Sequence, residues 1–97
     1  MLYIIMCLTK NLQDAIKDIS TCKNIPINYK TNLIDIAQKI LYLWPKNEDV
    51  AMRSANQAIF SDDLRKKAES LSTKSKKVVL NIIYLFECFA FYDIPDL

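Results

Sequence analysis

The groups in this chain that could do chemistry are two pairs of adjacent carboxylates, three cysteines and a cluster of basic residues. Two carboxylates can act as general acid and base when they face one another. Glu48–Asp49 and Asp62–Asp63, however, each stand where a helix is expected to begin, and adjacent helical residues do not face each other. Negative charge complements the positive start of a helix, so we interpret both pairs as capping electrostatics.

The chain contains neither glycine nor histidine. Without glycine there is no Gly-rich loop whose backbone could cradle a phosphate. Without histidine there is no imidazole base, no Ser–His or Cys–His pair and no ordinary zinc site. Cys7, Cys22 and Cys88 form no C-x-x-C motif, and we expect reduced, mostly buried thiols. We therefore predict a protein that is not an enzyme and has no catalytic residue, metal, cofactor or small-molecule substrate.

The charges are unevenly distributed, although the formal net charge is only +2. Residues 1–64 hold seven basic and seven acidic side chains, residues 65–77 hold six basic side chains against Glu69, and residues 78–97 are acidic. The basic segment is either a solvated corner or a contact surface for phosphate or for an acidic protein. Cations at a helix start cost ~0.3–1 kcal/mol each, and such a local cost can mark a functional site. We expect the contact surface to include Arg65, Lys66, Lys74, Lys76 and Lys77.

Apolar residues at gaps of three and four predict the helices that must position this surface. The first helix is expected from about Tyr3 to Thr21, although Leu2–Cys7 alone could be a strand. Asn32 is the expected N-cap of the second helix, which Pro45 should end because its ring disfavours helical geometry in the preceding residue.

Two further helices are expected, of which the fourth is short. Asn47 should cap the third helix, and Ser61 should cap the fourth, with Phe60 and Leu64 forming a hydrophobic staple. Ser72–Ser75 is expected to be a polar connection. A narrow stripe of small residues on the third helix should permit close packing, and it consists of Ala51, Ala55, Ala58 and Ile59.

The last expected helix, Val78 to Tyr92, is apolar nearly all round. Fifteen residues span about 22 Å, which is too short for a bilayer of about 30 Å, so we expect burial at the centre of the fold. Asn81, Tyr84, Glu87 and Phe91 fall on one stripe. The stripe is either the solvent side of a core helix or a secondary contact surface, with Tyr84 as anchor and Glu87 beside it.

These elements predict a single all-α domain over residues 1–97, a compact bundle of four or five helices with a very apolar central C-terminal helix. The apolar run Met1–Leu8 lacks the basic start and the cleavage site of a signal peptide, so we expect a cytoplasmic protein. The expected core residues are Leu8, Leu12, Ile16, Ile36, Ile40, Leu64, Leu71, Val79, Ile82, Ile83, Leu85, Phe86 and Phe89.

Small helical chains without catalytic groups suit the inhibition or neutralisation of another protein. In size and helix pattern, though not in any diagnostic motif, the chain resembles the compact helical-bundle immunity proteins of bacteria. We therefore expect a protein partner, such as a toxin or an enzyme with an acidic surface, and a role like that of an immunity protein, an antitoxin or a phage-encoded inhibitor.

A nucleic-acid-binding regulator that uses residues 65–77 is the alternative. Two observations count against it: only Arg53 and Arg65 are arginines, and the apolar last helix has no face to read a groove. Binding to a membrane surface through Lys74–Lys77 is a weaker interpretation still.

Overall fold

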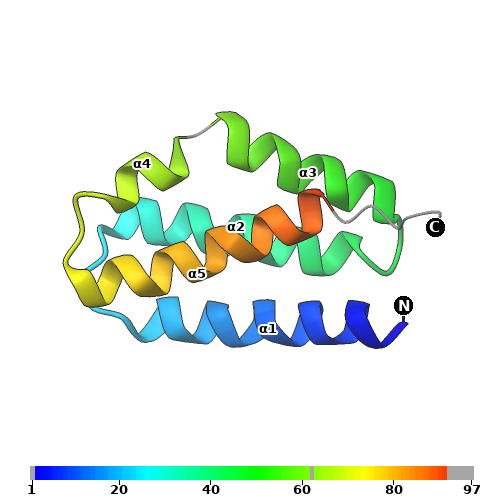
Figure 1. The fold of residues 1–97 in the computed structure, drawn as a ribbon, viewed down its shortest axis with the longest axis horizontal. Coiled ribbons are helices and arrows are strands. Elements are labelled where there is room, and N and C mark those ends of the chain that lie inside the picture. The colour runs from blue at the N-terminus through cyan, green and yellow to red at the C-terminus, as the bar shows by residue number, and fades with distance from the viewer. Residues whose placement is uncertain (1, 62, 92–97) are drawn as a thin grey trace.

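Four long helices lie side by side and alternate in direction, with a fifth, short helix at one end (Figure 1). The computed structural model describes the backbone of residues 2–61 and 63–91 and the side chains of residues 7–60 and 63–91. The helices are α1 (Leu2–Thr21), α2 (Ile27–Leu43), α3 (Glu48–Ser61), α4 (Leu64–Ala68) and α5 (Thr73–Ala90). The predicted all-α bundle is therefore confirmed, and Leu2–Cys7 is helical, not a strand.

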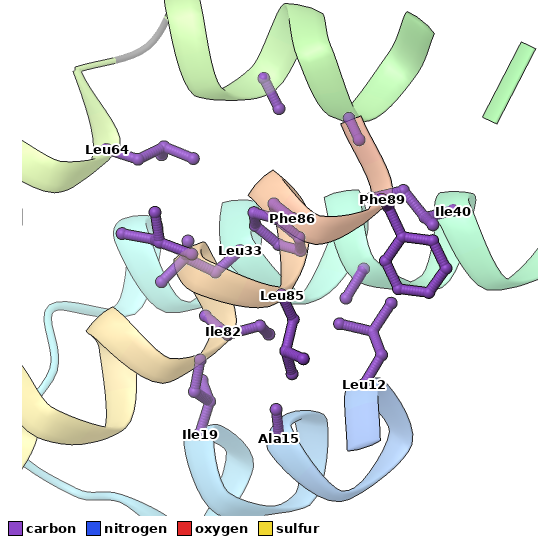
Figure 2. Close-up of a cluster of buried hydrophobic side chains, with 14 of the residues drawn as sticks. Leu12, Ala15, Ile19, Leu33, Ile40, Leu64, Ile82, Leu85, Phe86 and Phe89 are labelled. Carbon is purple, nitrogen blue, oxygen red and sulfur yellow. The ribbon is translucent and has the colours of Figure 1, made fainter. Parts of the chain in front are cut away.

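Each long helix packs against two others: α1 lies between α2 and α5, and α3 lies between the same two helices on the opposite side. The short α4 joins α3 to α5 and contacts both. Figure 2 shows side chains of α1, α2, α4 and α5 meeting in one buried cluster. No helix among the described residues is long and apolar enough to cross a membrane.

The apolar C-terminal helix supplies many of the buried side chains. Those of α5 include Val79, Ile82, Ile83, Leu85, Phe86 and Phe89. Leu12, Ile40 and Leu64 are buried as predicted, and Trp44 packs its ring edge-to-face on Phe89 with 4.9 Å between centroids. The other expected core residues are only partly buried at the margin of this cluster, namely Leu8, Ile16, Ile36 and Leu71.

The stripe of small residues on α3 forms as predicted. Ala51, Ala55 and Ala58 are buried and Ile59 is partly buried, so that α3 approaches both α2 and α5 through methyl groups. Asn47 caps this helix, because its Oδ1 accepts a hydrogen bond of 3.2 Å from the Val50 N–H.

The predicted N-cap of the second helix is wrong. Helix α2 begins at Ile27, and Asn32 lies half-buried in its second turn. Pro26 occupies the N-cap position, where its missing N–H costs nothing, and its carbonyl accepts a hydrogen bond of 2.9 Å from the Lys30 N–H. The early start places Tyr29 inside the fold.

The predicted start of the fourth helix is also wrong. Ser61 still belongs to α3, and Asp63 occupies the N-cap position of α4 with a left-handed backbone (φ 49°), a conformation that aspartate tolerates better than most residues. Phe60 is 72% exposed on the last turn of α3 while Leu64 is buried, so no staple joins them. Asp62 lies outside the described residues.

The last helix starts five residues earlier than predicted. Ser72 is its N-cap, and the Ser72 Oγ accepts a hydrogen bond of 3.4 Å from the Ser75 N–H. Ser72–Ser75 is thus the first turn of α5 and not a connection. The predicted end at Tyr92 lies outside the described residues, and α5 itself ends at Ala90.

One buried side chain ties α2 to α4. The Tyr29 hydroxyl donates a hydrogen bond to the carbonyl of Leu64, the first residue of α4. Burial raises the pKa of Tyr29 to about 12. The Nζ of Lys67 lies over the same ring, 5.9 Å from its centroid. Tyr29 therefore holds the short helix against the start of α2.

Replacing Tyr29 with phenylalanine should lower the free energy of unfolding by about 1–3 kcal/mol at neutral pH, because the buried Leu64 carbonyl loses its donor. The measurement is urea denaturation followed by circular dichroism. In the parent, the stability due to the neutral buried phenol is complete below the unfolded pKa of about 10 and is lost as pH rises through the folded value of about 12. The stability of the phenylalanine variant should not show this decrease with rising pH.

Tyr42→Phe, at an exposed position on α2, is the control and should change stability by less than about 0.5 kcal/mol. Equal effects of the two substitutions would show that Tyr29 does not tie α4 to the bundle.

Candidate functional site

Three of the predicted contact residues lie together in the first two turns of α5. Lys74 and Lys77 are exposed and Lys76 is half-buried, and the first turn of this helix carries no acidic residue. The three ammonium groups therefore stand at the positive end of the helix without the usual compensation. Lys66 and Lys67 are exposed on the neighbouring α4.

Two further lysines, Lys23 and Lys30, join this group from a distant part of the chain. The Cys22 Sγ lies 3.5 Å from the Ser75 Oγ, 53 residues later, so the connection between α1 and α2 abuts the start of α5. Figure 1 shows this connection and the turn between α4 and α5 at the same end of the molecule. Lys30 donates a hydrogen bond of 2.5 Å from its Nζ to the Cys22 carbonyl.

A groove between α1 and α5, with a volume of about 460 Å³, shows how the two segments meet. Lys23 and Asp18 line it from the first segment, and Lys74 and Ser75 line it from the second. The two segments are residues 18–30 and residues 65–77. We call their seven lysines the basic end, which consists of Lys23, Lys30, Lys66, Lys67, Lys74, Lys76 and Lys77. The acidic side chains within these segments are Asp18 and Glu69, so positive charge prevails.

The predicted contact surface lacked Lys67, although it lies in the basic segment 65–77, and it lacked Lys23 and Lys30, which lie outside that segment. Residues 1–64 are electrically balanced as a whole, so nothing in the spacing of these two lysines distinguishes them from the others. Only the packing of α1 against α5 brings them to the segment 65–77.

The structure pairs Arg65 with Glu87, so that Arg65 is neutralised although it adjoins Lys66 and Lys67 on α4. Their side chains form an ion pair with 2.5 Å between the Arg65 Nη2 and the Glu87 Oε2, at exposed fractions of 53% and 34%. Glu87 follows Lys77 by ten residues, or about 15 Å along the helix. The predicted contact surface is thus divided into a cationic end and a neutral pair that links α4 to α5.

The predicted stripe on α5 is exposed in part. Asn81, Tyr84 and Phe91 reach solvent, whereas Glu87 is turned toward Arg65 on α4. Phe60, which sequence analysis assigned to a staple, contacts Phe91 from α3 with 6.3 Å between ring centroids and an interplanar angle of 80°. A hydrogen bond with Cys88 raises the pKa of Tyr84.

The cysteines are free, but the expectation that they are mostly buried is wrong: Cys7 is exposed, and Cys22 and Cys88 are half-buried. The hydrogen bond with Ser75 lowers the pKa of Cys22. The backbone of Asn24 and the charges of Lys30 and Lys74 act in the same direction, while burial opposes them. In the described part of the chain, no three His, Cys, Asp or Glu side chains lie close enough to hold a metal ion.

Replacing Ser75 with alanine should move the midpoint of Cys22 alkylation to higher pH, because the hydrogen bond is the largest cause of the lowered pKa. The measurement is the rate of iodoacetamide labelling against pH, with the labelled cysteine identified by peptide mass spectrometry. Thr73→Ala, an exposed change in the same turn, should leave the midpoint in place. A midpoint that stays constant in the Ser75 variant would show that this hydrogen bond does not lower the pKa of Cys22.

Arg65→Ala and Glu87→Ala, singly and together, should give a coupling free energy of about 0.2–1 kcal/mol, because the pair is substantially exposed to water. The coupling should shrink at high salt, since screening weakens exposed ion pairs. Urea unfolding of the four proteins measures it. A coupling well above this range would mean that the pair is a principal support of α4.

Comparison with known proteins identifies no relative. No protein-family model matches the chain, no curated protein is similar to it in sequence, and no solved structure matches it. The likeness of the chain to immunity proteins in size and helix pattern therefore stays a prediction. The use of the basic end must be inferred from the residues of this chain itself.

Proposed function

We propose that this protein is a non-catalytic binding domain that inhibits or neutralises another protein, as immunity proteins and antitoxins do. The observation that carries the proposal is the basic end, where lysines of two distant segments meet at the start of α5 and on the adjoining α4. The partner that complements it is a protein with an acidic surface, such as a toxin or an enzyme.

The basic end is costly to the fold, and this supports a role in binding. Like charges at close range repel one another, and the lysines of α5 oppose the helix dipole by ~0.3–1 kcal/mol each where exposed. An acidic partner would relieve both effects. Complementary charge also raises the rate of encounter between proteins and suppresses association with the wrong partners.

The basic end is also held in a defined shape. The Tyr29 hydroxyl anchors α4 through the Leu64 carbonyl, and the Cys22–Ser75 and Lys30–Cys22 hydrogen bonds join the α1–α2 connection to α5. A surface held in this way loses little conformational entropy when a partner binds, which favours tight association.

Reversing three charges with Lys74→Glu, Lys76→Glu and Lys77→Glu should weaken partner binding at least about tenfold, or 1.4 kcal/mol, because the contact becomes repulsive. The protein should remain folded by circular dichroism, since none of the three side chains is fully buried. The partner is first captured from an extract of the native cells, in nuclease-treated and untreated halves, and its affinity for each variant is then measured by calorimetry.

The matched control reverses three exposed lysines outside the basic end, Lys10, Lys39 and Lys46, with the same change in net charge. Equal losses in the two triple variants would remove the basic end from the contact surface. A bound species lost on nuclease treatment would instead favour the nucleic-acid-binding regulator. In that case the logarithm of the affinity should fall with the logarithm of salt concentration by about 0.9 per neutralised phosphate of duplex DNA.

A further inference from the structure

A strip of exposed side chains runs along α5 from the basic end to the other end of the helix. Lys77, Asn81, Tyr84, Cys88 and Phe91 are spaced by three or four residues and therefore share one face. All are exposed except Cys88, which is half-buried. The strip thus begins with a cation and ends with aromatic rings.

Three aromatic rings, at the middle of the strip and at its far end, lie outside the core. Phe60, Tyr84 and Phe91 are 72%, 59% and 58% exposed, whereas the neighbouring Phe86 and Phe89 are fully buried. The edge-to-face contact of Phe60 with Phe91 joins α3 to this end of α5 and fixes both rings against each other. We call these three side chains the aromatic end.

From this arrangement we infer that the partner presents one continuous segment along α5, acidic where it meets Lys74 and Lys77 and apolar where it meets the aromatic end. The inference rests on the proposed function and specifies the chemistry and the direction of the bound segment. Charge complementarity with the lysines requires the first half of the segment to be acidic. Burial of the three exposed rings requires the second half to be apolar.

The length of the strip limits the segment. Lys77 and Phe91 are fourteen residues apart, which is about 21 Å along a helix. A helical segment of about 14 residues, or an extended one of six or seven residues, spans this distance. The Arg65–Glu87 pair borders the strip on the side that faces α4, and its charges cancel. The direction of a bound segment is therefore set by the charge of the basic end and the apolar surface of the aromatic end.

The test selects binders from a random library of displayed peptides of about 16 residues, a length that covers the strip. The full chain is the bait, and selected peptides are synthesised and their affinities measured by fluorescence anisotropy. We expect peptides with acidic residues in one half and aliphatic or aromatic residues in the other. Phe60→Ala with Phe91→Ala, and separately Lys74→Glu with Lys77→Glu, should each weaken binding at least tenfold.

A matched control removes two exposed apolar side chains from α2, Ile27→Ala with Tyr42→Ala, and should leave the affinity within twofold. Peptides that bind the Phe60/Phe91 variant as tightly as the parent, or a selection that yields no binder, would overturn the inference. If the lysine variant alone loses affinity, the continuous segment is wrong while the proposed function stands. If neither variant loses affinity for the selected peptides, the strip is not the docking surface, and the triple charge reversal against the native partner decides the proposed function separately.

Discussion

The architecture depends on the close approach of α3 to α2 and α5, which only small side chains permit. Ala51, Ala55 and Ala58 place methyl groups at these contacts, leaving the space between the long helices to the larger side chains of α5. Filling this space with Phe86 and Phe89 fixes the rotation of α5 about its axis. That rotation decides which of its side chains face water, and so it places both Lys77 and Tyr84 on the surface.

The helices and much of the core follow from apolar periodicity, because burying one face of each helix is the strongest constraint on this chain. The starts of α2, α4 and α5 could not be found in this way. The first turn of α5 is polar, so the apolar pattern begins only at Val78, and the cap at Ser72 is visible only as one serine among several. Helix α2 likewise starts directly after Pro26, a residue that is equally typical of a break between helices.

The sequence predicted only those parts of the candidate site whose residues lie close together along the chain. The lysines of 65–77 stand out in the composition, but the arrival of Lys23 and Lys30 depends on the packing of α1 against α5. The pairing of Arg65 with Glu87 spans 22 residues and turns two expected contact groups into a bridge within the fold. Tertiary structure thus both enlarged and divided the surface that the charge distribution indicates.

The shortness of α4 bears on motion as well as on shape. A helix of five residues cannot persist by itself, because the cost of its first turn exceeds what so few backbone hydrogen bonds return. It exists through the Tyr29 hydroxyl, the buried Leu64 and the bridge to Glu87. Lys66 and Lys67 are therefore carried by a helix that exists only through its tertiary contacts, so a change that breaks these contacts would also disorder this part of the basic end.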